Sequence, residues 1–302
     1  MNKRSLKNIS ASVHQRLLNI ARDTERPFNE VLQYFAMERF LHRLSRSPNA
    51  DSFVLKGALL FRVWDVPDSR ATRDIDFLAY VDNSPENLAA IFREICKIDD
   101  ADDGLVFDPD TVEAQRIKED AEYEGVRTRF RGQLGKARIV MQVDVGFGDL
   151  IHPSAVQADY PVLLDLPAPS LRMYPPETVI AEKAEAMVYV GSLNSRMKDF
   201  YDIWRMSQQF DFRSEVLCEA VRGTFQNRDT EVIEFDYLVT ELIGNANFEK
   251  QWSAFLRKSA LAGPDDFSEV LTEISEFLSP IFASIRNNDS ADGVWQAPGP
   301  WK

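Results

Sequence analysis

Residues 72–81 read TRDIDFLAYV. Polar and apolar residues alternate along this stretch, which indicates a β-strand with one buried face. Because successive side chains of a strand point to opposite faces, Asp74 and Asp76 leave the same face, with α-carbons roughly 6.7 Å apart. Mg²⁺ prefers hard oxygen ligands of this kind. The stretch therefore predicts a strand that carries a metal-binding pair.

A third carboxylate lies in the most apolar of three further strands expected between residues 112 and 145. This strand contains RIVMQVDVGF (138–147), in which Asp144 lies between two valines. A charge in a buried run needs a partner or a metal. Three such carboxylates can hold the two metals of a phosphoryl or nucleotidyl transferase. An isolated Asp-x-Asp is weak evidence, because the chain has 48 acidic residues and Asp108 and Asp110 repeat the pattern in an expected loop.

The segment FVLKGALLF (53–61) predicts a strand, a turn of small residues and the start of a helix. Such a turn, Lys56-Gly57-Ala58, lets backbone amides approach phosphate oxygens. The alternative is that Gly57 only permits a tight turn.

The rest of the chain predicts three parts. Residues 1–50 have helical periodicity and form a helical hairpin, residues 51–160 form the core with the strands, and residues 161–302 form a helical domain. Ser84-Pro85 starts a helix in the core. Residues 150–176 are rich in proline and predict irregular structure at the domain boundary, and Pro280 predicts a kink or break in a long helix. The tail with Trp295 and Trp301 is either a docking arm or disordered.

Lys183 falls on the apolar face of an expected helix. It either extends its ammonium group to water or points at a triphosphate. The stretch RMKDFYDIW (196–204) then supplies Arg196, Lys198 and Asp199, with Asp202 four residues after Lys198. The simplest interpretation of this stretch is a helix surface with a weak Lys198–Asp202 pair.

Alternating arginines at 127, 129 and 131 face one side of an expected strand. Such a row is most often a solvated sheet face. If it borders the carboxylates, it is the best local basic patch for an RNA backbone, and Lys136 and Arg138 extend it.

Composition limits the function classes. With 35 Lys and Arg against 48 Asp and Glu, the formal net charge is −13, so any contact with nucleic acid must be local. Cys96 and Cys218 form no metal or redox motif, which favours a reducing cytoplasm. No secretory signal or membrane-spanning run is visible.

Five motifs in this order resemble the AbiEii/AbiGii-type toxin nucleotidyltransferases of the DNA polymerase beta-like superfamily. They are FVLKGALLF, TRDIDF, VMQVDVGFGD, PPETVIAEKAEAM and RMKDFYDIW, spread over about residues 53–205. The resemblance implies an α+β fold in which a mixed sheet with flanking helices is followed by a helical C-terminal domain. The sequence departs from the pattern at Ala58, where a Gly or Ser is common, and in the longer segment Leu59–Arg73 before Asp74.

The resemblance also implies roles for individual residues, with Mg²⁺ (or Mn²⁺) as cofactor and a nucleoside triphosphate as substrate. The implied metal ligands are Asp74, Asp76 and Asp144, which with Lys183 and Asp199 form the catalytic set. The implied nucleotide-binding residues are Lys56, Gly57, Ala58, Arg73, Arg196 and Lys198.

The family's toxins act in bacterial toxin–antitoxin systems and abortive infection, with a cognate antitoxin that is often a winged-helix repressor, and some modify the tRNA 3′ end. The resemblance therefore predicts a cytoplasmic nucleotidyltransferase that acts on RNA, with tRNA as the expected acceptor. Two alternatives stay open: a non-catalytic protein that binds nucleotide or antitoxin, and transfer to a protein hydroxyl.

Overall fold

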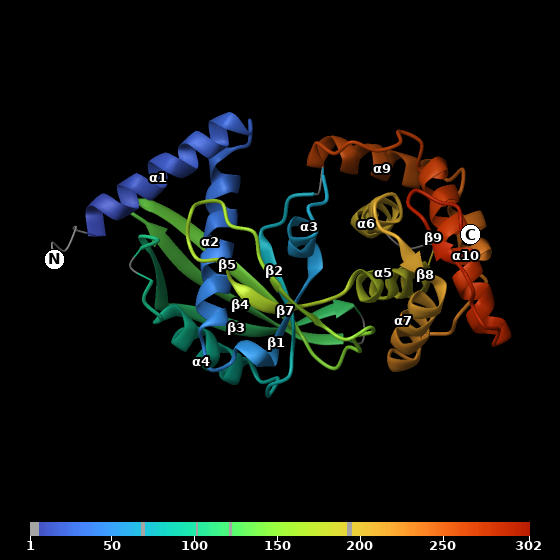
Figure 1. Ribbon diagram of the computed structural model, residues 1–302, viewed down its shortest axis with the longest axis horizontal. Coiled ribbons are helices and arrows are strands. Elements are labelled where there is room, and N and C mark those ends of the chain that lie inside the picture. Colours follow the sequence, from blue (N-terminus) through green and yellow to red (C-terminus); the bar gives the residue numbers. More distant parts are fainter. Residues whose placement is uncertain (1–5, 68–69, 101, 121–122, 192–194) are drawn as a thin grey trace. The chain divides into compact units, whose positions relative to one another are not determined.

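The computed structural model describes residues 6–67, 70–100, 102–120, 123–191 and 195–302 (Figure 1). Helices alternate with strands in the first half and dominate the second half, so the predicted α+β fold with a mixed sheet and a following helical part is confirmed. The elements preceding the long hairpin are α1 (Leu6–Asp23), α2 (Phe28–Ser45), η1 (Ala50–Ser52), β1 (Phe53–Lys56), η2 (Gly57–Leu59), α3 (Leu60–Val63), β2 (Asp74–Ala79) and α4 (Pro85–Cys96). They are followed by β3 (Leu105–Asp120), β4 (Tyr123–Leu134), β5 (Ala137–Gly146), β6 (Val156–Asp159) and β7 (Ser170–Met173).

The chain forms two compact units. The first comprises the chain up to Asp65, Ala71–Gly148 and Val156–Met173; the second comprises Val66–Arg70, Asp149–Ala155 and Tyr174–Lys302. The three-part division into 1–50, 51–160 and 161–302 stays a prediction, because compactness alone does not show which segment folds independently.

The first unit is built on a seven-stranded mixed sheet with the order β3-β4-β5-β2-β1-β7-β6. β2 pairs in parallel with β5, and β1 in parallel with β7, while the other neighbours are antiparallel. β2 therefore lies in the middle of the sheet, where its charged residues are fixed from both sides.

One face of this sheet is covered by α2 and α4. Phe40 of α2 contacts the rings of Phe92, Phe107 and Phe130, with centroids 4.9–5.7 Å apart. Along β5 every second residue from Ile139 to Val145 is buried in this core. The alternation follows from the pleat of a sheet that is covered on one side. The predicted helical hairpin (α1, α2) and the helix capped by Ser84 (α4) are confirmed.

The prediction of irregular structure for residues 150–176 is wrong for two strands. β7 pairs with β1, and β6 pairs with β7 at the edge of the sheet. Each strand has four residues, and the prolines lie outside them. Segments this short carry too little periodicity to predict a strand, and β6 can be largely exposed because it is an edge strand.

The second unit is mainly helical. Its elements are α5 (Pro176–Val190), α6 (Met197–Ser207), β8 (Phe212–Arg213), α7 (Ser214–Asn227), α8 (Phe235–Leu242), α9 (Ala246–Ser259), α10 (Phe267–Asn287) and β9 (Val294–Trp295). α10 continues past Pro280, so a break there is wrong. No helix in the described ranges combines the length and apolar composition needed to cross a bilayer.

The tryptophan tail is docked on the second unit. The Trp301 ring stacks on Phe277 with centroids 5.9 Å apart, and Trp295 packs on the same ring at 5.0 Å. The indole N–H of Trp295 donates to the carbonyl of Ser207, and that of Trp301 to the carbonyl of Phe277. Of the two alternatives for the tail, the structure shows the docked arm.

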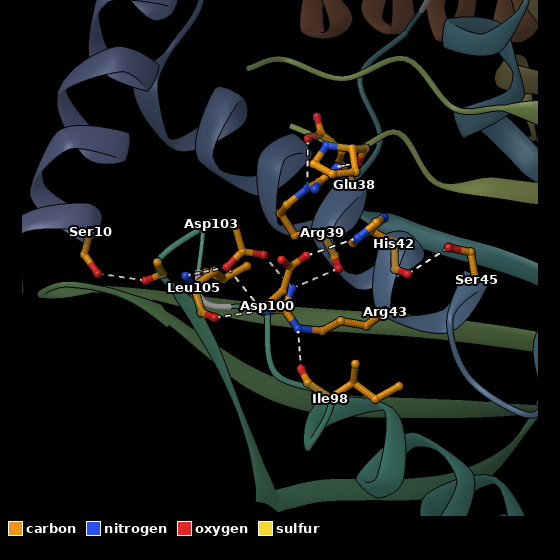
Figure 2. Close-up of polar contacts among 12 residues, drawn as sticks. Ser10, Glu38, Arg39, His42, Arg43, Ser45, Ile98, Asp100, Asp103 and Leu105 are labelled. Carbon is orange, nitrogen blue, oxygen red and sulfur yellow. Dashed lines mark hydrogen bonds and ion pairs between the residues drawn. The ribbon is translucent and has the colours of Figure 1, made fainter. Parts of the chain in front are cut away.

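Within the first unit, polar side chains of α2 bind loops that are distant from α2 in sequence (Figure 2). Arg43, which is 2% exposed, binds both carboxylate oxygens of Asp103 and the carbonyl oxygens of Ile98 and Leu105. Glu38 accepts a hydrogen bond from the backbone N–H of Leu163, and burial raises the pKa of Glu38 to about 7 despite the neighbouring Arg39. These contacts position the entry to β3 and the loop before β7.

We expect Asp103→Asn to lower the free energy of unfolding by about 3 kcal/mol, because it leaves the Arg43 charge buried without its carboxylate. Asp102→Asn is the matched control, since Asp102 is exposed one residue earlier. Urea unfolding of both variants measures the difference. Similar losses in the two variants would contradict a structural role for the Arg43–Asp103 pair.

Candidate active site

Asp74 and Asp76 begin β2 and extend from the same face of the sheet, both half-buried. On the neighbouring parallel strand β5 they lie opposite Gln142 and Asp144 respectively. Ile75, between the two aspartates, and Phe77, after them, are completely buried on the other face. The buried residues thus anchor the strand and hold the two carboxylates at its open face.

The turn after β1 lies directly against Asp76. Lys56 pairs with Asp76 in the β1–β2 register, and the backbone of Gly57 adopts φ +74°. A Cβ at Gly57 would overlap the Asp76 carboxylate. Glycine is therefore required here both for the backbone angle and for the close approach. Ala58 is buried, and Arg73 lies exposed just before β2.

Asp144 is 5% exposed and bound by an arginine of β4. The Nε and Nη2 atoms of Arg127 donate to its two carboxylate oxygens at 2.8 and 2.7 Å. Gln142 donates to the second oxygen at 3.3 Å. Such a bidentate pair fixes the plane of the carboxylate.

The donor set of the first unit fits a divalent cation through Asp74 and Asp76. Both are hard oxygen donors on a rigid strand, as Mg²⁺ prefers. Asp144 already accepts three hydrogen bonds, from Arg127 and Gln142, so little of its acceptor capacity is left for a cation. Accordingly, within the described ranges no group of three or more His, Cys, Asp or Glu side chains is arranged to hold a metal.

A second cluster of charges lies in the second unit, around α5 and α6. The Nζ of Lys183 is 2.7 Å from Asp199 Oδ1 and 2.7 Å from Asp202 Oδ2. Arg196 Nε is 2.6 Å from the other oxygen of Asp199, and Arg70 donates to both oxygens of Asp202. Both aspartates are 1% exposed. Lys183 therefore neither extends to water nor stands alone.

The pKa values follow from these contacts. Burial alone would raise the pKa of Asp199, but Lys183 and Arg196 lower it to about 2. Burial would lower the pKa of Lys183, but Asp199 and Asp202 raise it above its ordinary value. The pKa of Lys198 is lowered by desolvation and by the nearby cations Lys183, Arg70 and Arg196, although Asp199 opposes them. Lys183 and Asp199 are thus both charged at neutral pH.

Sequence reasoning misses Arg70 altogether and misses the partners of Asp202 and Arg127. Asp202 binds Lys183 and Arg70, so the predicted Lys198–Asp202 pair is wrong. The spacing of Asp202, three residues from Asp199 on one helix, was the available signal. Arg127 lies beside Asp144 only because of the β4–β5 register, and Arg70 is 132 residues from its partner, so no local pattern identifies either.

The chain is similar to known proteins over much of its length. Residues 39–273 match the family model described as nucleotidyl transferase AbiEii toxin, type IV TA system, a range that includes every candidate residue. Two solved structures from Helicobacter pylori, each with a TM-score of 0.43, also match. JHP933 is 15% identical, with coverage of 83% of this chain and 90% of that chain, and a putative nucleotidyltransferase is 14% identical, with 83% and 94%. No curated protein matches the sequence.

We expect Gly57→Ala to lower the free energy of unfolding by about 1–3 kcal/mol more than Gly244→Ala. Both glycines have nearly the same positive φ, but a Cβ at Gly244 meets no atom within 4 Å. Comparing the two variants thus separates the cost of backbone strain from the cost of overlap with Asp76. Urea unfolding measures the free energy of unfolding of each variant. Equal losses of unfolding free energy in the two variants would show that overlap with Asp76 does not destabilise the fold.

The stabilisation by Asp199 should fade in acid. Because its folded pKa of about 2 lies below the usual aspartate value of 3.8, the stabilisation is complete above pH 4 and is lost as the pH falls through 2. The stability difference between wild type and Asp199→Asn should therefore shrink by about 1 kcal/mol from pH 5 to pH 3. Urea unfolding at both pH values tests this, and a difference that does not change with pH would argue against the buried ion pairs.

Proposed function

Because this chain belongs to the AbiEii family of nucleotidyl transferase toxins from type IV toxin–antitoxin systems, we propose that it transfers a nucleotidyl group from a nucleoside triphosphate to RNA, with the tRNA 3′ end as acceptor. The oxygen of the acceptor hydroxyl forms a bond to the α-phosphorus, the bond from that phosphorus to pyrophosphate breaks, and the hydroxyl proton is released.

One observation carries the proposal: Asp74 and Asp76 leave the same face of a central strand, beside a glycine turn that approaches Asp76. A Mg²⁺ or Mn²⁺ ion held by these two carboxylates would neutralise charge on the phosphate oxygens. Lys56, Gly57, Ala58 and Arg73 flank the pair and are proposed to contact the nucleotide. Asp144, oriented by Arg127, is the proposed third carboxylate.

Cations of the second unit are proposed to neutralise the charge of the triphosphate. Lys183, Arg196 and Lys198 are proposed to bind the triphosphate, since ammonium and guanidinium groups stabilise phosphate oxygens as charge develops. Asp199 holds Lys183 and Arg196 by ion pairs at 2.7 and 2.6 Å, so it is proposed to orient both cations.

The family's type IV toxin–antitoxin origin also implies an antitoxin. We propose that the partner is a winged-helix repressor and that the protein acts in the cytoplasm during abortive infection. Co-expression with a winged-helix repressor encoded beside this chain should relieve the growth inhibition that the chain causes.

The direct test is incorporation of label from each of the four α-labelled nucleoside triphosphates into total bacterial RNA, with magnesium. We expect label in RNA with wild type and at least a hundredfold less with Asp76→Asn, because that change removes a hard anionic donor. Asp82→Asn is a matched control, since Asp82 lies in the loop after β2. Equal labelling by wild type and Asp76→Asn would refute the assigned site. Label in protein instead of RNA would move the acceptor to a protein hydroxyl.

A further inference from the structure

The face of the sheet that α2 and α4 leave uncovered continues from the carboxylates across β5 and β4. The register places Asp76, Asp144 and Arg127 in one row across three strands, and Asp74, Gln142 and Arg129 in the next. The following rows pair Arg131 with Val140 and Gln133 with Arg138. We call the exposed part of β4 and β5, made of Arg129, Arg131, Gln133, Arg138 and Val140, the arginine face.

The arginine face carries cations that the protein does not neutralise. Arg131 and Arg138 are exposed and make no ion pair in the part of the chain that the structure describes. The side chain of Arg129 is likewise exposed, and its Nε donates to the neutral Gln142 at 3.1 Å. In a chain with net charge −13, three such guanidinium groups on two adjacent strands form a local positive surface that an external anion can bind.

Acidic residues of β3 border the face on one side, and the carboxylates of the candidate site border it on the other. Asp108 and Glu113 of β3 lie opposite Arg131 and Arg129 in the register. The Asp108 carboxylate accepts a hydrogen bond from the backbone N–H of Asp110. Both residues lie in β3, where the register with β4 shifts after Asp108, so the prediction that this Asp-x-Asp lies in a loop is wrong. On the other side, β5 presents Arg138, Val140 and Gln142 before Asp144 is reached. A polyanion is thus disfavoured over β3 and favoured along β4 and β5.

The spacing suits a chain of phosphates. Arg129 and Arg131 are two residues apart on one strand, roughly 6.7 Å, and Arg129 lies two strands from Asp74, roughly 10 Å. Each guanidinium can bind a phosphate in a bidentate manner. Val140 is 65% exposed between these arginines and offers an apolar contact to a sugar or base.

We propose that the arginine face binds the sugar–phosphate backbone of the RNA acceptor and leads its reacting end toward Asp74 and Asp76. This inference rests on the proposed function for the identity of the acceptor. The acceptor RNA would thus bind to β4 and β5 of the first unit, through residues other than those proposed to bind the triphosphate.

The experiment measures binding of a fluorescein-labelled bacterial tRNA by anisotropy, without nucleoside triphosphate, over a range of potassium chloride concentrations. Binding is thereby read independently of catalysis. The variant is Arg129→Gln with Arg131→Gln. The matched control is Arg257→Gln with Lys258→Gln in α9, two exposed cations that also make no ion pair in the described ranges.

We expect the arginine-face variant to bind tRNA roughly tenfold more weakly, with a slope of log K against log salt less steep by about 1.4. The control should keep the affinity and slope of wild type. Arg129→Lys with Arg131→Lys should restore most of the slope, because lysine also neutralises phosphate. Where labelling is active, the KM for tRNA should rise while the KM for the triphosphate stays the same.

Wild-type affinity and slope in the Arg129→Gln, Arg131→Gln variant would overturn the inference, even if labelling remains active. An equal loss in the α9 control would overturn it too, since binding would then follow only overall charge. Loss of antitoxin binding with unchanged tRNA affinity would assign the face to a protein partner and refute the proposal. Arginine-dependent tRNA binding by a chain that labels no RNA would support this inference and count against the proposed reaction.

Discussion

The close approach of the Gly57 backbone to the Asp76 carboxylate constrains the rest of the first unit. It requires β1 and β2 to pair so that Lys56 lies opposite Asp76, and it requires a residue without a Cβ at the turn. β2 is fixed on its other side by β5, in the register that aligns Asp76 with Asp144. A slip of one residue would turn both β2 carboxylates into the core, so the hydrophobic pattern of the strand and its charged pair enforce the same register.

Both units hold their buried carboxylates with cations from other segments. Arg127 of β4 binds Asp144, while Lys183 of α5 binds Asp199 and Asp202 of α6. Desolvation makes an unpaired buried charge costly, so each pair fixes two elements together as well as two side chains. The ion pairs that orient these groups are therefore part of the packing of each unit, and their geometry is set before any ligand arrives.

The sequence determines these features to different degrees. Alternation around Asp74 and Asp76 predicts β2 because a strand with one buried face has a period of two, and Ser84-Pro85 predicts α4 because the cap is local. β6 and β7 escape prediction because four residues between prolines carry no clear period. Arg127 and Arg70 escape because their partners are 17 and 132 residues away, and only the folded register brings such charges together. The proposed roles of the site residues come from the motifs and the chemistry of the side chains, and the packing alone does not assign them.

A net charge of −13 does not prevent this chain from binding RNA. At physiological ionic strength charges are screened over a Debye length of about 8 Å, so a phosphate on the sheet responds mainly to the nearest side chains. Arg129 and Arg131 are within that distance of one another along β4. The overall negative charge instead weakens unspecific adsorption of nucleic acid elsewhere on the protein. A local arginine face on an acidic protein therefore favours an acceptor that is bound in one place and one direction.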